Sequence, residues 1–400
     1  MDYRKNSAGN MRHHPPPTVY RQMETVVTML CQALLGQAMP EAWGGLTAAE
    51  WDRLAMLAAN HGVETLLCQR FTADGWPAPL PAAARQKLRA AAYTSRAHNL
   101  QLYQELGRLL ALLTPLTPLV LLKGAALGPG LYAQPALRPL TDLDLLVPST
   151  ALAAVTSCLL AHGYRMVPSL APELLPQVEP HIALLGGPGG DLSVELHWGL
   201  TAGSADWRAA PIDWFWQQTE PWAAPTGFVA QAGALRFSPT AQLLHLAAHL
   251  VLRHGNTPTR LIWVYDLHLL VGQSPIDWPL LVAQARALGW GAVVVAALAQ
   301  ASQCFGTPVP TWVLNALHEP LDARTAFYGP ASTSYRLRTT WSDLAQIDLP
   351  IRLRLLLRVI FPSRAYLRAN YQPVWGKLWP LAYPYRWLKP LRVLINRVRR

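Results

Sequence analysis

Residues 141–148, with the sequence TDLDLLVP, constrain the fold more than any other part of this chain. Side chains two residues apart in a β-strand point to the same face of the sheet. Asp142 and Asp144 therefore share one face, while Leu143, Leu145 and Val147 point the other way, toward a core. A chain with such a strand must build a sheet, although most of its other segments have helical patterns.

Composition and charge exclude two broad classes of protein. Apolar residues make up 51% of the chain and charged residues only 14%, against about 25% charged in an average soluble domain, so the chain is not mainly disordered. The net charge is +11, but residues 351–400 hold twelve Lys and Arg with no Asp or Glu, which leaves 22 basic and 23 acidic residues elsewhere. The basic charge thus belongs to the C-terminal segment, and sequence-specific nucleic-acid binding is not expected.

The cysteines, the N-terminus and the apolar segments indicate in which cellular compartment the protein is expected. Four cysteines stand alone, without the spacing of a disulfide framework or a metal site: Cys31, Cys68, Cys158 and Cys304. The polar N-terminus lacks the apolar stretch of a signal peptide, so we expect a cytoplasmic protein. Residues 287–317 contain no charged residue, but Gln300, Ser302 and Pro308 interrupt them. We therefore predict a buried helix at 291–304 rather than a membrane span.

The pattern along the chain predicts an α+β fold, with a small mixed β-sheet core flanked by N-terminal and C-terminal helical modules. The expected segments are a disordered tail (1–19), an N-terminal helical module (20–114), an α/β core (115–205), a C-terminal helical module (206–320) and a basic aromatic extension (321–400). Thr47 followed by Glu50 predicts a capping box at a helix start. Ser238 followed by Pro239 predicts another helix start.

Within the core we expect four strands and one helix. A buried strand at 119–122 ends at Gly124, and the acidic strand follows. A helix at 151–162 is closed by Gly163. Strands at 181–185 and 192–198 are joined by the turn GGPGG.

The paired acids predict a metal site. Two carboxylates on one strand face repel each other unless a cation lies between them. Mg²⁺ prefers oxygen ligands and often shares them with phosphates. A third acid on a neighbouring strand would complete a two-metal site, and Glu195, between the apolar Val194 and Leu196, is the candidate. The alternative is that the two aspartates are only the polar face of an edge strand.

The order of several motifs resembles a known family. These motifs are LKGAAL, LYAQPALRPLTDLDLLVP, LLAHGY, VELHW, LLHLAAHLVLRHG and RLIWVYDLHLL. Over residues 50–310, and again in FPSRAYLRANY, the chain resembles the uncharacterised bacterial nucleotidyltransferase family of the DNA polymerase β-like superfamily. The resemblance implies transfer of a nucleoside monophosphate from an NTP, ATP foremost, to an acceptor that the sequence does not identify.

The resemblance also implies roles for individual residues. Asp142, Asp144 and Glu195 would bind two Mg²⁺ ions, for which Mn²⁺ can substitute. Lys123 and Gly124 occupy the place of the superfamily's phosphate-contacting turn, and Arg138 is placed to meet phosphates. The turn here is KGA rather than GS or GG, and the third acid is Glu where Asp is commoner. These departures support an alternative, a non-catalytic nucleotide- or partner-binding protein tethered by its basic tail.

Several polar residues admit both a functional and a structural interpretation. Lys123 either neutralises phosphates or closes a strand at the surface, and His197 either approaches the metal or is an ordinary partly buried histidine. His245 and His249 have the spacing of a zinc pair, but without the HExxH glutamate we favour a structural role. Arg260 and Asp266 either line the far side of the cleft or form a salt bridge.

The C-terminal residues 384–400 form a predicted basic amphipathic helix. Leu391, Leu394, Ile395 and Val398 recur at helical spacing among arginines, downstream of several Trp and Tyr residues. Such a helix suits peripheral contact with an anionic membrane. The alternative is a helix packed on its own protein with a solvated basic face.

Overall fold

The computed structural model describes most of the chain. The described residues are 17–37, 43–169, 174, 180–187, 190–200, 212–222, 233–254, 260–318 and 348–388. They divide into two compact units, with the boundary between Thr94 and Ser95. The predicted tail at 1–19 lies almost entirely outside the described residues, as do the centre of the GGPGG turn and residues 389–400.

The first unit is helical, as predicted. It contains α1 (Pro17–Leu34), α3 (Ala48–His61), α4 (Glu64–Asp74) and the first part of α5 (Ala82–Leu113). The capping box at α3 is confirmed, because the Glu50 amide donates to the Thr47 hydroxyl and the Thr47 amide donates to the Glu50 carboxylate. Stacked rings of Trp43 and Trp51, with centroids 5.2 Å apart, anchor this unit's core.

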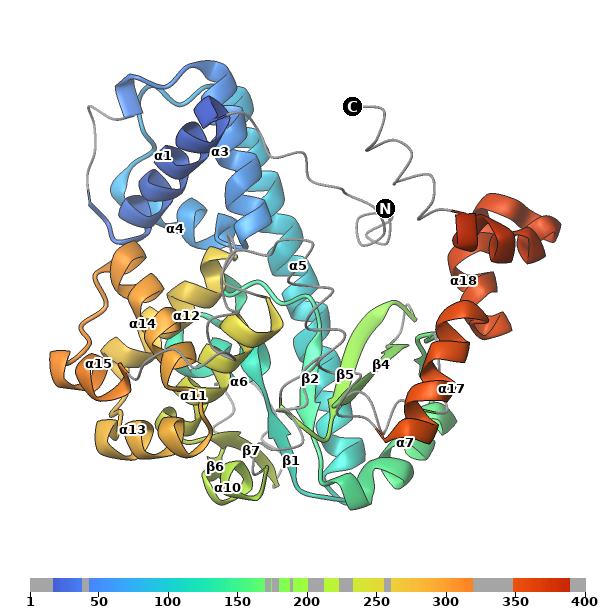
Figure 1. The fold of residues 1–400 in the computed structure, drawn as a ribbon. Helices are drawn as coiled ribbons and strands as arrows, with labels where there is room; N and C mark the ends of the chain where they lie inside the picture. Colours follow the sequence, from blue (N-terminus) through green and yellow to red (C-terminus); the bar gives the residue numbers. More distant parts are fainter. Residues whose placement is uncertain are drawn as a thin grey trace. The chain divides into compact units, whose positions relative to one another are not determined.

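The second unit is built on a seven-stranded mixed sheet in the order β3-β4-β5-β2-β1-β7-β6 (Figure 1). The strands are β1 (Leu119–Leu121), β2 (Leu143–Leu146), β3 (Arg165–Met166), β4 (His181–Gly186), β5 (Leu192–His197), β6 (Thr219–Pro221) and β7 (Ala234–Phe237). β2 runs parallel to β5 and β1 runs parallel to β7, whereas the other neighbours are antiparallel. The α+β fold class and the mixed sheet are therefore as predicted.

Helices connect and cover these strands. Between β1 and β4 lie α6 (Lys123–Leu131), η2 (Pro135–Leu137), η3 (Ser149–Ala151) and α7 (Leu152–Ala161). The core beneath the sheet joins Leu143, Leu145 and Val147 to Val155 and Leu159 of α7. The apolar face of the acidic strand is thus buried, as its alternation predicts.

The sheet is larger than the predicted core, and its boundaries differ. β6 and β7 were not predicted, and β7 pairs with β1 through Leu119↔Ala234 and Val120↔Leu235, so the sheet continues past residue 205. At the other end the predicted boundary at 114 falls too late. The second half of α5 places Leu102, Leu106 and Leu113 in the same buried cluster as the strands, which is why this part of the helix belongs to the second unit.

A second set of helices lies on either side of β6 and β7 in the sequence. It comprises α10 (Ile212–Gln217) before β7, then α11 (Pro239–Ala248), the π-helical turn η5 (His249–Arg253), α12 (Leu261–Gln273), α13 (Trp278–Ala287), α14 (Gly291–Phe305) and α15 (Thr311–Leu317). α11 begins at Pro239 after Ser238, as predicted, but the Ser238 side chain makes no capping hydrogen bond. α14 is the predicted buried helix, with Val294, Ala297 and Leu298 inaccessible to solvent. In the described part of the chain, no helix combines the length and apolarity needed to cross a membrane.

The last described helices are α17 (Leu349–Ile360), α18 (Arg364–Trp375) and η7 (Gly376–Leu381). Leu367 of α18 and Ala382 after η7 are fully buried, so these two segments pack together. α17 differs, because none of its residues is buried.

Candidate active site

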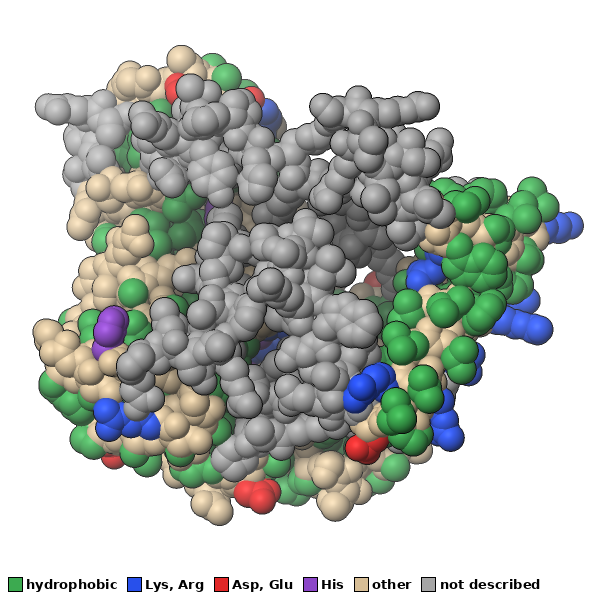
Figure 2. Space-filling model, in the orientation of Figure 1, with side chains coloured by type: hydrophobic (Ala, Val, Ile, Leu, Met, Phe, Trp, Pro, Cys, Tyr) green, Lys and Arg blue, Asp and Glu red, His purple; other side chains and the backbone are tan. Residues whose placement is uncertain are grey.

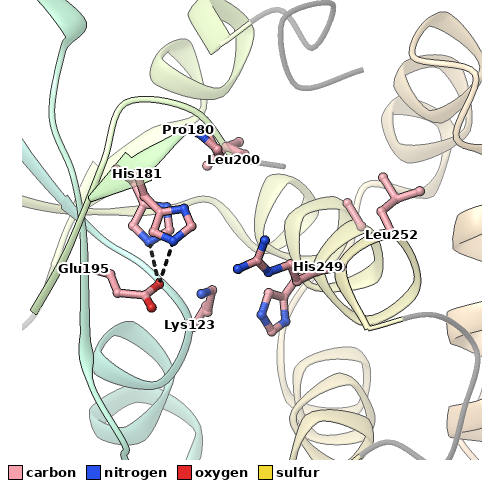
Figure 3. Close-up of a pocket in the computed structure, with 10 residues that line it drawn as sticks. Lys123, Pro180, His181, Glu195, Leu200, His249 and Leu252 are labelled. Carbon is pink, nitrogen blue, oxygen red and sulfur yellow. Dashed lines mark ion pairs between the residues drawn. The ribbon is translucent and has the colours of Figure 1, made fainter. Parts of the chain in front are cut away.

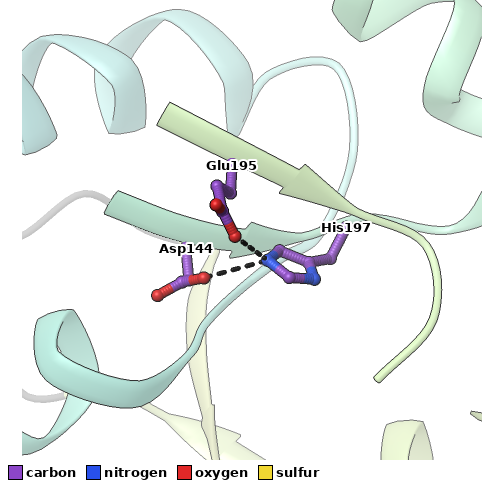
Figure 4. A group of neighbouring side chains, drawn as sticks. All are labelled: Asp144, Glu195 and His197. Atoms are coloured by element: carbon purple, nitrogen blue, oxygen red, sulfur yellow. Dashed lines mark hydrogen bonds and ion pairs between the residues drawn. The ribbon is translucent and has the colours of Figure 1, made fainter. Parts of the chain in front are cut away.

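The parallel pairing of β2 and β5 brings two of the predicted acids together. Asp144 lies opposite Glu195 in the register, and Leu143 lies opposite Val194. One carboxylate oxygen of each acid and one ring nitrogen of His197 lie within 4.8 Å of one another (Figure 4). His197 Nε2 is 2.9 Å from Asp144 Oδ1 and 3.4 Å from Glu195 Oε2. His197 therefore bridges the two carboxylates.

Lys123, the first residue of α6, joins this group from the end of β1, which is the neighbour of β2 on the side away from β5. Its Nζ donates to Asp144 Oδ1 over 2.6 Å, and its side chain is only 16% exposed. The predicted surface position for this lysine is therefore not observed. Lys123 has a φ of 47°, the only positive φ at a non-glycine residue among those described. This left-handed conformation is unfavourable for a residue with a Cβ, and it occurs where the chain leaves β1 and enters α6.

Asp142 precedes β2, and its carboxyl group has a raised pKa. Burial, together with repulsion from Asp144 and Glu195, raises its pKa to about 7. The charge of Lys123 lowers this pKa, but it offsets only part of the increase. At neutral pH this carboxyl group is therefore poised to exchange its proton for a cation.

The pKa values of the neighbouring groups are shifted in the direction that favours their charged forms. Burial alone would raise the pKa of Asp144, but Lys123 and His197 outweigh it and hold that pKa well below its usual range. Burial alone would raise the pKa of Glu195, but the hydrogen bond from His197 and the charges of Lys123 and His197 together lower it. Burial alone would lower the pKa values of Lys123 and His197, but the surrounding carboxylates raise both.

A pocket opens beside these residues (Figure 3). Its lining includes Lys123, His181, Glu195 and His197 from the sheet side and His249 and Arg253 from the π-helical turn η5. The imidazoles of His181 and His197 stack with centroids 4.9 Å apart, because β4 and β5 pair these two residues directly. His181 Nε2 is 3.9 Å from Glu195 Oε2.

Sequence reasoning missed two of these pocket residues. His181 begins a predicted strand, and working out the register of the hairpin with 192–198 would have placed it opposite His197. Burial, followed by the charge of His197, lowers the pKa of His181 to about 4, so this ring is neutral at physiological pH. Arg253 carries no such signal, because its position depends on the π-helical turn, and such turns are frequent at functional sites.

The sequence of this chain matches a known protein family. Residues 47–306 match the family described as uncharacterised nucleotidyltransferase. The chain belongs to this family. No curated protein and no solved structure matches the chain.

Membership in the nucleotidyltransferase family assigns the chain a transferase role with a nucleotide substrate. The matched residues contain every strand of the sheet and all the pocket residues named above. They end at the close of α14, so α17 and α18 lie beyond the match.

Arg138, predicted to meet phosphates, is buried in an ion pair. Its Nη2 lies 2.7 Å from Asp266 Oδ2, and its Nε donates to both oxygens of that carboxylate. The Tyr132 hydroxyl donates to Asp266 Oδ1 over 2.6 Å. Asp266 thus pairs with Arg138 rather than with Arg260, whose guanidinium lies 5.9 Å from the ring centroid of Trp263. Neither Arg138 nor Asp266 lines the described pocket.

The same ion pair explains why residue 124 is a glycine. It is buried in the first turn of α6, and a Cβ at this position would lie 2.0 Å from Arg138 Nη1 and 2.3 Å from Leu140 Cδ2. Only glycine allows the guanidinium to pass so close to the backbone. Contact of Gly124 with phosphate remains a prediction, whereas the close packing of Arg138 and Leu140 against Gly124 is observed.

The segment before the acids is held by α5. Asn99 is fully buried, and its side-chain amide donates to the carbonyl of Arg138 over 2.8 Å. The amide of Leu140 donates to Asn99 Oδ1, also over 2.8 Å. One side chain thereby satisfies two backbone groups just upstream of Asp142, which fixes the path of the chain into β2.

The two helical histidines with zinc-like spacing do not act as a pair. His245 is 1% exposed and packs edge-on against Phe237, with ring centroids 5.7 Å apart. His249 Nε2 instead lies 3.2 Å from His254 Nε2, and both rings contact Trp263. Within the described residues, neither belongs to a group of three metal-ligating side chains.

The donor set fits a divalent cation. Asp144, Glu195 and His197 offer two oxygens and one nitrogen within 4.8 Å, and Asp142 adds an acid whose pKa is raised by burial and by the charges of Asp144 and Glu195. Oxygen donors suit Mg²⁺, and the imidazole makes Mn²⁺ equally acceptable. Lys123 and His197 both contact Asp144 Oδ1, so a cation bound through this oxygen would displace one of them.

Proposed function

We propose that this chain transfers a nucleoside monophosphate from an NTP, ATP foremost, to an acceptor and releases pyrophosphate. The observation that carries the proposal is the register of β2 and β5, which sets Asp144 beside Glu195, a residue of the pocket. Asp142 is close enough for the charges of these two acids to raise its pKa. Family membership supports the same reaction class.

In this proposal Asp142, Asp144 and Glu195 hold Mg²⁺ ions, with Mn²⁺ as a substitute. The ions would supply charge neutralisation for the phosphates. The chain's own residues position the reacting groups. Lys123 and Arg253 bring positive charge to the pocket, and His197 holds the two carboxylates in place from between them.

The test is incubation of the purified protein with labelled ATP, GTP, CTP and UTP plus Mg²⁺ or Mn²⁺, with and without host lysate. We expect label transfer or pyrophosphate release that EDTA abolishes. Asp142→Asn and Glu195→Gln should eliminate the reaction. Asp191→Asn is the matched control, because Asp191 is an exposed acid adjoining β5 and lies outside the cluster. Equal turnover in all three variants would remove the cluster from the chemistry.

A second candidate is a nucleotide-binding protein without transfer activity. It is favoured by the two cationic partners, Lys123 and His197, that already occupy Asp144 Oδ1. Binding of labelled nucleotide without turnover, at full metal saturation and in the presence of lysate, would select this candidate. A cytoplasmic location and membrane contact through residues 384–400 also remain predictions. Tyr385, Trp387 and Leu388 of that segment are exposed.

A further inference from the structure

Helix α17 presents its apolar side to solvent. Leu349, Leu353, Leu356, Leu357 and Ile360 recur at the spacing of one helical face. Their exposed fractions lie between 37% and 60%, although such a stripe normally faces a core. Ile351 and Leu355, on the opposite side, are the partly buried ones. Figure 2 shows the resulting hydrophobic side chains gathered over α17 and α18.

The apolar surface continues beyond the end of α17. The Trp387 indole donates to the carbonyl of Ile360 over 2.9 Å, and its ring meets Phe361 edge-on at 5.5 Å. Phe361 is 50% exposed and Trp387 is 46% exposed. We call the five residues of the stripe, with Phe361 and Trp387, the α17 face. It is one continuous surface drawn from two segments of the chain.

The segment that carries this face is strongly basic. Residues 349–388 contain seven Lys and Arg and no Asp or Glu. Arg354, Arg364 and Lys377 are exposed, and Figure 2 shows basic side chains among the hydrophobic ones. An exposed apolar stripe on a basic segment that has no acidic residue, with Trp at one end, matches the boundary between acyl chains and anionic headgroups.

We propose that the α17 face binds the surface of an anionic membrane, with its leucines in the interface and its arginines among the headgroups. This role is independent of the proposed nucleotidyl transfer. It also differs from contact through residues 384–400 alone, because the stripe of α17 supplies most of the apolar surface.

The experiment is sedimentation of the full chain with vesicles of phosphatidylcholine mixed with phosphatidylglycerol, and with phosphatidylcholine alone. We expect binding to the mixed vesicles that salt weakens. The double variant Leu353→Glu/Leu357→Glu should reduce the partition coefficient by roughly tenfold or more, since two leucines no longer enter the interface. Leu100→Glu is the matched control, because Leu100 is a leucine of α5 that is 61% exposed.

Each remaining outcome decides against the proposal. Wild-type protein that ignores mixed vesicles at low salt overturns it, as does a double variant that binds like wild type. Loss of helix content or a collapsed melting temperature in the double variant would show that the stripe is core. Complete loss of binding on deletion of residues 389–400, which leaves Trp387 and the rest of the α17 face in place, would assign the contact to the tail. A change from dimer to monomer without vesicle binding would identify a second copy as the occupant.

Discussion

Asp142 and Asp144 are separated by one residue, yet substituting them should affect stability in opposite directions. Asp144 is buried against Lys123 and His197, so Asp144→Asn leaves a buried lysine without its carboxylate. Breaking a buried ion pair costs about 3–5 kcal/mol in the free energy of unfolding. Asp142→Asn removes repulsion instead, so the metal-free protein should be as stable as wild type or more so. Thermal unfolding in EDTA measures both, and equal destabilisation would contradict this distinction.

The raised pKa of Asp142 predicts a pH dependence. Its pKa rises from 3.8 to about 7 on folding, so the folded state binds more protons than the unfolded state between these values. The stability from this group is present below the lower value and is lost as the pH rises toward 7. In EDTA, the melting temperature of Asp142→Asn relative to wild type should therefore increase from pH 5 to pH 8. A difference independent of pH would show that Asp142 titrates normally.

At the scale of elements, the Arg138–Asp266 pair connects the segment before β2 to α12. Asp266→Ala strands a buried guanidinium and should cost about 3–5 kcal/mol in the free energy of unfolding. The double variant Arg138→Met/Asp266→Asn removes both charges and retains an acceptor for Tyr132, so it should recover much of that loss. Glu220→Ala is the control, because the Glu220–Arg236 pair is 36% exposed on both sides and should contribute about 1 kcal/mol or less.

The same double variant separates the two interpretations of Arg138. If the guanidinium only supports the fold, nucleotide turnover should return along with stability. If it contacts phosphate, turnover should stay low in a stable protein. Chemical denaturation and the labelled-nucleotide assay, run on the same preparation, distinguish these outcomes.

Sequence patterns predicted the elements whose signal is local. The alternation around Asp142 and Asp144 gave β2 and its buried face, and Thr47 with Glu50 gave the start of α3. β6 and β7 were missed because they are short, and because β7 is stabilised by pairing with the distant strand β1 and β6 by pairing with β7. His181 and Arg253 were missed because hairpin register and a π-helical turn, rather than local pattern, bring them to the pocket. Arg138 and Asp266 were both singled out, but the ion pair between them was not predicted, because the two residues lie 128 positions apart in the chain.

At the scale of the whole molecule, all candidate metal ligands belong to the second unit, residues 95–400. A cation that binds only the folded state should raise its free energy of unfolding by mass action, by about 2.7 kcal/mol at a hundredfold excess over the dissociation constant, and should therefore raise its melting temperature. Calorimetry with Mg²⁺ or Mn²⁺ should show this shift in wild type and a reduced shift in Glu195→Gln. An identical shift in that variant would place the cation elsewhere.

β1 lies inside the sheet, between β2 and β7, and this position sets the order in which its two edges can pair during synthesis. β1 can pair with β2 soon after both leave the ribosome, because a short connection separates them. Its other edge must wait for β7, since Val120 pairs with Leu235. Until then a fully apolar strand keeps an open edge, which is a template for wrong pairing between nascent chains. Slowing translation between β5 and β7 should therefore increase aggregation of this protein more than slowing it after β7.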